Sequence, residues 1–161
     1  MSRQVLWAPW RMSYVEAAKP REGCIFCDLP ASGDPRENLV LHVEEHAVVM
    51  LNRYPYNSGH LMVSPRRHAA DPAELAPAEW IGLMDALRRA LAVLREALRP
   101  DGVNVGANLG AVAGAGIAAH LHWHLVPRWS GDTNFMPIIA EVKVLPQHLL
   151  ATYDLLKQRY D

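Results

Sequence analysis

The sequence predicts an α+β fold, in which an antiparallel sheet packs with one long helix and a C-terminal helix. Short apolar runs bounded by turn residues occupy the first half of the chain, as the strands of such a sheet do. An amphipathic stretch follows Pro77, and apolar residues return at helical spacing near the end of the chain. The chain has 161 residues, half of them apolar, which is the length of a single domain with one sizeable core.

Composition restricts the classes of function. The formal net charge of −1 argues against a nucleic-acid-binding surface built on bulk charge. No run approaches the roughly 18 apolar residues of a membrane span, and the N-terminus has no apolar signal-peptide core before Pro9. We therefore expect a cytoplasmic protein with neither nucleic acid nor membrane as a partner. Two cysteines three positions apart do not make a secreted disulfide framework.

The N-terminal region has two distinct parts. Residues 1–22 carry Trp7, Trp10 and Tyr14 in irregular order, so we expect an arm that packs on the domain or reaches across a dimer. Cys24 and Cys27 follow. A Cys-x-x-Cys pair on a turn is a common half-site for zinc, although a buried pair of small side chains or a redox dithiol explains it about as well. Turn formers then fill residues 30–37.

Three apolar runs, at 39–43, 47–51 and 61–63, predict an antiparallel meander, because each is short enough for a strand and is bounded by turn residues. Asn52 closes the second run and His60 opens the third. Taken alone, these residues are explained as a turn-forming asparagine and a histidine that caps a strand.

The long helix is predicted by spacing. Asp71 and Glu74 form a capping-box pattern ahead of it. After Pro77, apolar residues repeat at steps of three and four over about 20 residues, and the pattern stops before Pro100. The stripe is typical of packing in a core or a dimer.

Three further elements complete the fold. A strand over 103–109 should pair with the histidine-rich strand described next. An extended stretch should cover 135–144, and a terminal helix should lie within 146–160. Between the paired strands, a run of glycine and alanine that includes Gly114 and Gly116 would let backbone N–H groups approach an anion, although a plain hairpin loop is the alternative.

His120, His122 and His124 alternate with apolar residues. Side chains in a strand alternate between faces, so a strand would place the three imidazoles on one face and their apolar neighbours on the other. Such imidazoles can serve as a nucleophile or ligand, as a donor to charged groups and as an orienting group. Alternatives are a half-buried strand with one polar face, or a site in which all three histidines bind one zinc and leave a position for water.

The run His120-Leu-His122-Trp-His124-Leu-Val, with Pro127 and Arg128 after it, resembles the signature of the histidine-triad (HIT) nucleotide hydrolases and transferases. The resemblance extends from about Gly23 to Trp129. The opening stretch at 6–12 and the later one at 131–137 resemble the bacterial branch that includes diadenosine tetraphosphate phosphorylases and hydrolases. The resemblance implies a HIT-like fold, a homodimer, and a purine nucleotide or dinucleoside polyphosphate as substrate.

The resemblance also implies catalytic roles. His122 would attack the α-phosphorus and form a nucleotidyl-histidine, which requires its proton on the other ring nitrogen; a backbone carbonyl near His120 could hold that proton. His124 would donate to a phosphate oxygen or the leaving group. Hydrolysis of nucleoside phosphoramidates, a zinc-dependent hydrolase and a nucleotide sensor without turnover are the alternatives.

A nucleotide site is implied around the triad. Asn52 would bind the ribose hydroxyls, while His60, Asn108 and the glycine loop with Gly114 and Gly116 would contact phosphates. An adenine slot would be lined by Ile25, Phe26, Met50 and Met62. The sequence departs from the family pattern just before the triad, because Gly116 and Ile117 stand where Gln and then Ser or Thr are common.

The resemblance further implies a structural zinc. Its ligands would be Cys24, Cys27, His68 and His120, a Cys2His2 set. Part of the binding energy would then stabilise the fold of the N-terminal region.

Overall fold

The computed structural model describes residues 23–132 and 148–160. The expected N-terminal arm, the extended stretch at 135–144 and most of the motif at 131–137 lie outside these ranges. The described elements are, in chain order, helix α2 (Ile25–Ala31), strands β1 (Val40–Val43), β2 (Ala47–Leu51) and β3 (Leu61–Pro65), 3-10 helix η2 (Pro72–Glu74), helix α3 (Pro77–Leu98), strand β4 (Gly102–Ala107), 3-10 helix η3 (Ala111–Ala113), strand β5 (Trp123–Arg128) and helix α5 (Leu149–Lys157).

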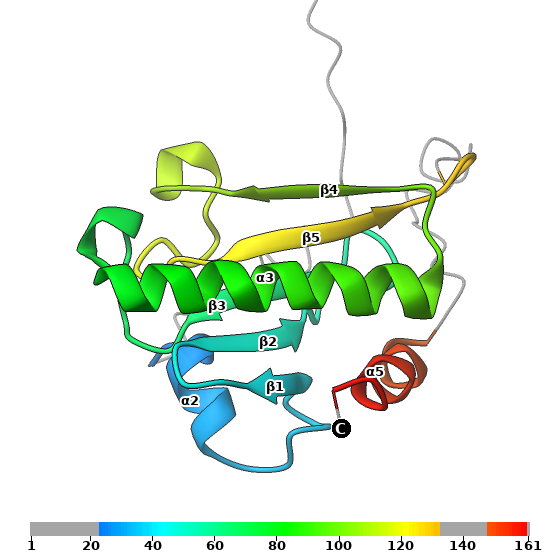
Figure 1. The fold of residues 1–161 in the computed structure, drawn as a ribbon, viewed down its shortest axis with the longest axis horizontal. Coiled ribbons are helices and arrows are strands. Elements are labelled where there is room, and N and C mark those ends of the chain that lie inside the picture. Colours follow the sequence, from blue (N-terminus) through cyan, green and yellow to red (C-terminus); the bar gives the residue numbers. More distant parts are fainter. Residues whose placement is uncertain (1–22, 133–147, 161) are drawn as a thin grey trace, which may run out of the picture.

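The strands form one sheet in the order β1-β2-β3-β5-β4, and the neighbouring strands are antiparallel (Figure 1). This confirms the predicted meander and the predicted pairing of the strand that begins at Gly102 with the histidine strand. The strand ends at Ala107, two residues earlier than the pattern predicts. Pairing of β5 between β3 and β4 places the triad region inside the sheet.

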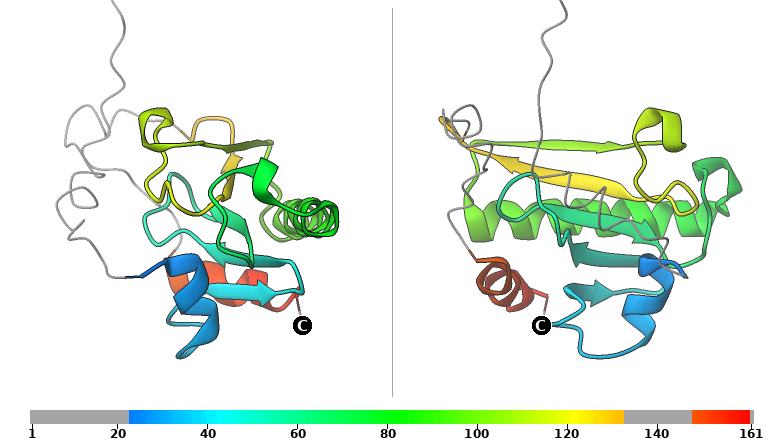
Figure 2. Two further views of the ribbon diagram at one scale, coloured as in Figure 1. Left: turned by 90° about the vertical axis from the view of Figure 1, so that its left-hand side faces the viewer. Right: turned by 180° about the vertical axis from the view of Figure 1, so that it is seen from behind.

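The two faces of the sheet pack against different helices. In β2, Ala47, Val49 and Leu51 join the core beneath α3, whereas Val48 and Met50 join a smaller cluster with Phe26 of α2. This division follows the alternation of side chains along a strand. Figure 2 shows α3 on one side of the sheet and α2 on the other. Because side chains alternate along the strands, one face of the sheet packs against α3 and the opposite face carries the site.

Helix α3 has both of its ends defined by local contacts. At its start, the side chain of Glu79 accepts a hydrogen bond from the backbone N–H of Ala76, 2.8 Å away. At its end, Arg99 adopts a left-handed conformation with φ 46°, which stops the helix one residue before Pro100. Leu83, Ala86, Ala90 and Leu94 face the sheet and are buried. The helix matches the predicted stripe, and the predicted capping box of Asp71 and Glu74 is present in η2.

The predicted terminal helix is α5. Its Tyr153 is buried and donates a 2.9 Å hydrogen bond to the carbonyl of Val40, so the helix is fixed to the first strand. An ion pair between Arg36 and Asp154 adds a second contact at the surface. Among the described residues, no helix is both long and apolar enough to cross a membrane.

Two local predictions about the N-terminal segment were wrong. The Cys-x-x-Cys pair does not lie on a turn: Cys24 precedes α2 and Cys27 lies in its first turn. The turn-rich segment begins later than predicted, because α2 continues through Pro30 to Ala31. Pro30 lacks the N–H that would donate to the carbonyl four residues earlier, and the helix ends one residue after it.

Candidate active site

The three triad histidines share one face but not one strand. Strand β5 begins at Trp123, so only His124 lies in it, and the prediction of a continuous strand from His120 was wrong. Pairing with β3 ends at Trp123, and the chain before it turns to bond elsewhere: the N–H of Leu121 donates to the carbonyl of Ala69, 2.7 Å away. The alternation itself holds, because Leu121, Trp123 and Leu125 pack in the core beneath α3.

His122 is held in the protonation pattern that a nucleophile needs. Its Nδ1 lies 2.8 Å from the carbonyl oxygen of His120, and a carbonyl can only accept, so Nδ1 carries the proton. The lone pair of neutral His122 is then on Nε2. Burial lowers the pKa of His122, while the bond to His120 opposes that shift. The ring also stacks on Phe26, with centroids 4.9 Å apart.

A second histidine pair fixes His124. The backbone N–H of Tyr56 donates to Nδ1 of His60, 3.1 Å away, so neutral His60 carries its proton on Nε2. That nitrogen lies 2.9 Å from Nδ1 of His124 and donates to it. His124 in turn carries its proton on Nε2. The geometry thus makes His122 a lone-pair donor and His124 a proton donor, with their ring centroids 4.9 Å apart.

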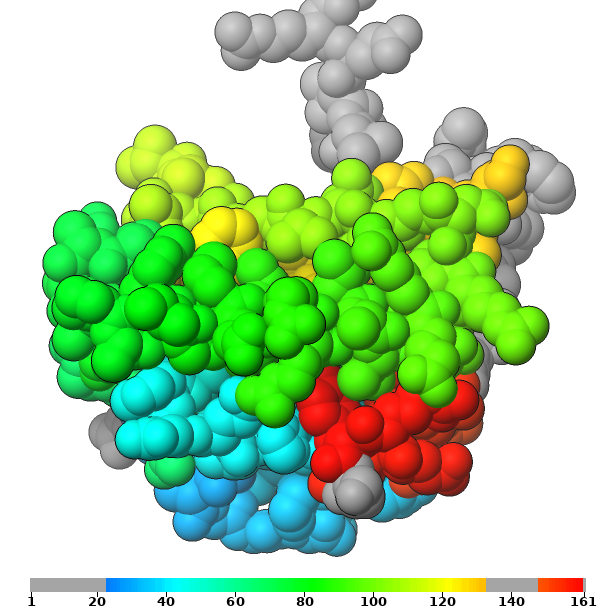
Figure 3. Space-filling view, in the orientation of Figure 1, coloured from blue at the N-terminus to red at the C-terminus, as the bar shows by residue number. Residues whose placement is uncertain are grey.

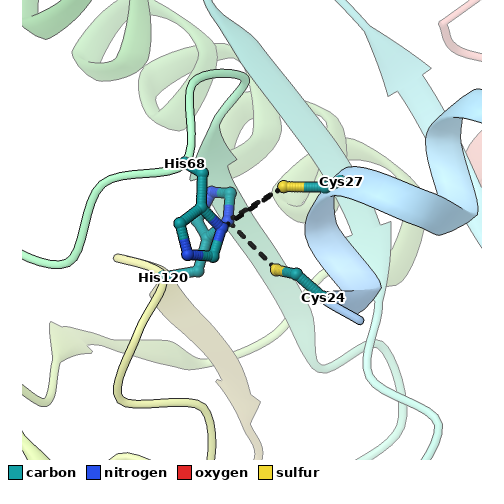
Figure 4. Close-up of side chains that lie close together, drawn as sticks. All are labelled: Cys24, Cys27, His68 and His120. Atoms are coloured by element: carbon teal, nitrogen blue, oxygen red, sulfur yellow. Dashed lines mark hydrogen bonds between the residues drawn. The ribbon is translucent and has the colours of Figure 1, made fainter. Parts of the chain in front are cut away.

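Cys24, Cys27 and His68 gather around His120, the first histidine of the triad (Figure 4). The ligand atoms of the four residues lie within 4.8 Å of one another. Nδ1 of His120 lies 3.2 Å from the sulfur of Cys24 and 3.6 Å from that of Cys27, which lies 3.4 Å from Nδ1 of His68. A tetrahedral zinc site with thiolate and imidazole ligands has ligand–ligand separations of about 3.3–3.8 Å. The four residues therefore fit zinc in identity and spacing.

His120 connects the cysteine cluster to His122. Its Nε2 donates to the carbonyl of Pro65, 2.9 Å away, which leaves the lone pair of neutral His120 on Nδ1, facing the cysteines. Its own carbonyl accepts the proton of His122. Burial lowers the pKa of His120 and so favours the neutral ring. Burial, followed by the hydrogen bond with Cys24, raises the pKa of Cys27 to about 11, so a cation would have to displace that proton.

The arrangement argues against a zinc ion bound by the triad itself. The ring nitrogens of His120 bond to the cysteines and Pro65, while Nδ1 of His122 is committed to a carbonyl. Nδ1 of His124 faces His60. Within the described residues, the group that could hold a metal ion is the set of two cysteines, His68 and His120.

The residues predicted to bind the nucleotide are only partly gathered. His60 joins the triad. Asn52 Oδ1 accepts a hydrogen bond from the N–H of Tyr54, as a turn-forming asparagine does. Asn108 Nδ2 donates to the carbonyl of Gly114, whose φ is 93°, so the amide holds the glycine loop in shape. The roles of Asn52, Asn108 and Gly116 toward a nucleotide stay predictions.

Phe26, Met50 and Met62 form the small apolar cluster on the site face, with Ile25 and Ile117 packed against it. The side chains of Phe26, Met50 and Met62 are buried, with exposed fractions of 1%, 2% and 6%. Phe26 nevertheless contacts His122 directly. The adenine slot stays a prediction, whereas the contact of the cluster with the ring of His122 is observed.

Sequence reasoning missed three residues that hold the site. Tyr56 sets the tautomer of His60 and stacks on its ring, with centroids 5.1 Å apart. Asn57 and Asp132 join the turn before His60 to the end of β5. The run Tyr-Pro-Tyr-Asn-Ser-Gly signals only a turn, and a turn signal does not reveal which side chains bond across to another strand.

The site and fold define a class of protein: an α+β domain with a tautomer-fixed histidine pair at the centre of an antiparallel sheet. The chain belongs to the HIT domain family, whose model matches residues 35–131. It is 42% identical to the AP-4-A phosphorylase of Mycobacterium tuberculosis (strain ATCC 25618 / H37Rv), over 95% of this chain and 82% of that protein. It is 31% identical to an uncharacterized HIT-like protein of Saccharolobus solfataricus, over 70% of this chain and 79% of that one.

Solved structures agree on the fold. A hypothetical histidine triad nucleotide-binding protein from Sulfolobus tokodaii superposes with a TM-score of 0.65 and 27% identity, over 84% of this chain and 88% of that one. A Zn-bound histidine triad family protein from Mycobacterium smegmatis superposes with a TM-score of 0.66 and 24% identity, over 85% and 92%. The predicted α+β, HIT-like fold is thereby confirmed.

Proposed function

We propose that this chain is a nucleotidyl-transferring enzyme that cleaves the α-phosphate linkage of dinucleoside polyphosphates, with diadenosine tetraphosphate as the model substrate. The observation that carries the proposal is the bond from Nδ1 of His122 to the carbonyl of His120, which leaves Nε2 as the nucleophilic nitrogen. The family membership and the AP-4-A phosphorylase relative support the choice of substrate.

The residues divide the reaction into two displacements. Nε2 of His122 attacks the α-phosphorus, a P–N bond forms, and the P–O bond to the leaving polyphosphate breaks. His124 donates its Nε2 proton to the phosphate oxygens or to the leaving oxygen as charge develops there. An acceptor then attacks the phosphorus from solution, and the P–N bond returns its electron pair to His122.

The acceptor decides which enzyme this is. From diadenosine tetraphosphate the first step releases ATP and leaves an adenylyl group on His122. Capture by inorganic phosphate gives ADP and makes the protein a phosphorylase, whereas capture by water gives AMP and makes it a hydrolase. The name of the Mycobacterium tuberculosis relative supports the phosphorylase.

The test is to incubate the protein with diadenosine tetraphosphate, with and without inorganic phosphate, and to resolve the products. We expect ADP and ATP with phosphate present. His122→Ala should lower turnover by at least about 10³-fold while the nucleotide still binds. His42→Ala is the matched control, because His42 contacts Tyr160 and Glu44 instead of the triad. Full activity of His122→Ala, or binding without product by the native chain, would refute the proposal.

A structural zinc on the two cysteines, His68 and His120 belongs to the same proposal. The spacing of the ligand atoms supports it, as does the buried lone pair on Nδ1 of His120. Free cysteines that serve as metal ligands suit a reducing compartment, so we place the enzyme in the cytoplasm. When bound, zinc supplies no chemistry to the phosphoryl transfer and instead ties α2 to the strands beside the triad.

We further propose that the chain is a homodimer joined through β4 and α3. Strand β4 is the end strand of the sheet and Val105 is 43% exposed; on α3, Ile81 is 67% exposed. Figure 3 shows α3 and β4 together on one face of the molecule. An exposed end strand can pair with its own copy. Val105→Lys should shift the mass measured by light scattering from dimer to monomer; a monomeric native protein would contradict this.

A further inference from the structure

The turn that carries His60 is built around that histidine. The backbone N–H of Tyr56 donates to Nδ1 of His60, and the N–H of His60 donates to the carbonyl of Asn57, 3.1 Å away. His60 is fully buried, and Gly59 has φ +79°, with space for a Cβ closed by Leu98 and Pro127. The position of this turn therefore sets the position of the ring that donates to His124.

A side-chain anchor fixes the turn to the far end of β5. Asn57 is 8% exposed, and its Nδ2 donates to the carbonyl of Pro127 at 2.9 Å and to Oδ2 of Asp132 at 2.7 Å. Both donor hydrogens of the amide are thus used. A side chain of the turn thus bonds both to the triad strand and to the segment that follows it.

Asp132 is itself rigidly held. Arg128 donates two hydrogen bonds to the carboxylate of Asp132, from Nε to Oδ2 at 2.6 Å and from Nη2 to Oδ1 at 2.9 Å. The backbone N–H of Trp129 also donates to Oδ2, at 3.2 Å. Arg128 Nη1 also reaches Asn104 of β4 at 3.2 Å. The hydrogen bond from Arg128, followed by those from Trp129 and Asn57, holds the pKa of Asp132 well below its usual range, so the carboxylate stays charged. Charge-assisted bonds with such geometry are stronger than neutral ones.

We propose that Asn57 and Asp132 are positioning residues that aim His60 at His124 and thereby keep the donor proton on Nε2 of His124. The anchor acts through the turn and does not touch the reacting atoms. This inference rests on the proposed function, because it assigns the anchor to the protonation of the leaving group in that reaction. Loss of the anchor should therefore weaken donation by His124 and leave the attack by His122 unchanged.

The experiment separates these two steps by leaving-group chemistry. The p-nitrophenyl ester of AMP releases an acidic phenol that departs without a proton, whereas the phenyl ester of AMP depends on proton donation. Asn57→Ala should lower kcat for the phenyl ester by about 10- to 100-fold and for the p-nitrophenyl ester by less than about 3-fold. Asp132→Ala removes one of the two bonds, so it should produce a smaller loss of the same pattern.

The matched control is Asp154→Ala. It removes a carboxylate from a two-bond ion pair with Arg36, a tie between distant segments that does not reach the His60 turn. Both esters should react with it at native rates. Should Asn57→Ala fail to fold, Asp132→Ala carries the comparison, because its side chain lies at the outer end of the anchor.

An NMR readout keeps the test independent of turnover. Two-bond ¹H–¹⁵N correlations of the imidazoles report which ring nitrogen carries the proton. The native protein should show Nε2–H for both His60 and His124, and the anchor variants should show a mixture at His124. Equal rate losses on both esters, or native tautomers in Asn57→Ala, would overturn the proposal. Failure of the native protein to turn over diadenosine tetraphosphate would instead refute the proposed function, and the tautomers would still decide the role of the anchor.

Discussion

Phe26 belongs to a buried apolar cluster and also contacts His122, the residue that we propose as the nucleophile. Its ring is 1% exposed, packs with Met50 and Met62, and stacks on His122 with an interplanar angle of 30°. Phe26→Ala should lower the free energy of unfolding by about 3–5 kcal/mol, because the cavity cannot fully collapse. Urea unfolding measures this.

Phe26→Leu separates the two contributions. Leucine keeps most of the buried volume but loses the stack on His122, so the rate of adenylylation measured by rapid quench should fall by about 10-fold. Its stability should fall less than that of the alanine variant. A native rate in Phe26→Leu would show that the stack does not orient the nucleophile.

At this scale the sequence specified residue types but not proton positions. The family resemblance implied the four-residue metal set, and the structure brings those residues together. It also implied His122 as the nucleophile, which stays a prediction. The tautomers depend on the carbonyl of His120 and the N–H of Tyr56, which only tertiary folding places. A carbonyl near His120 was expected to hold the proton of His122, and the structure confirms it. The N–H of Tyr56 was missed, because backbone groups have no sequence signature.

At the scale of elements, the start of α3 is stabilised by a charge that titrates. Glu79 accepts two hydrogen bonds from Arg67 and one from the N–H of Ala76. These bonds, that of Arg67 first, lower the pKa of Glu79 from 4.5 to about 2. Because the folded pKa is depressed, the stabilisation is complete above the unfolded value and is lost as the pH falls toward the folded one.

Glu79→Gln should therefore lower the thermal midpoint near neutral pH, and its difference from the native protein should shrink as the pH falls from about 5 toward 3. Differential scanning fluorimetry across that range measures both midpoints. Glu96→Gln on the same helix is the control, since Glu96 is 73% exposed and its contact with Arg159 is long, at 3.4 Å. A Glu79→Gln difference that is constant with pH would contradict the argument.

Elements with a strong period were predictable, and those defined by tertiary contacts were not. The apolar stripe after Pro77 predicted α3 closely, because a 22-residue helix repeats its pattern many times. Helix α2 spans only 7 residues and includes Pro30, which reads as a turn former. The triad strand was predicted too long, because the bond from Leu121 to Ala69 that ends it is invisible in the sequence.

At the scale of the whole molecule, the four residues that could hold a metal ion bring distant parts of the chain together. Cys24 and His120 are 96 positions apart, and Cys27 and His68 are 41 apart. A bound ion would close both loops and hold α2 against the strands that carry the triad. Since an unfolded chain offers no preformed site, the binding free energy contributes directly to folding.

Removal of the proposed zinc should therefore lower stability before it affects chemistry. Extensive chelation should lower the thermal midpoint by more than about 10 °C, given the strength of structural zinc sites. Cys24→Ser should purify with less than one zinc per chain and show a smaller shift on chelation, whereas His42→Ala should behave as the native protein. Elemental analysis and fluorimetry provide the two measurements. Below its own midpoint, the chelated protein should still form the adenylyl adduct on His122. The lone pair of His122 and the proton of His124, which we propose for the transfer, are fixed by hydrogen bonds within the chain. Loss of the adduct in a chelated but folded protein would show instead that the metal takes part in the reaction.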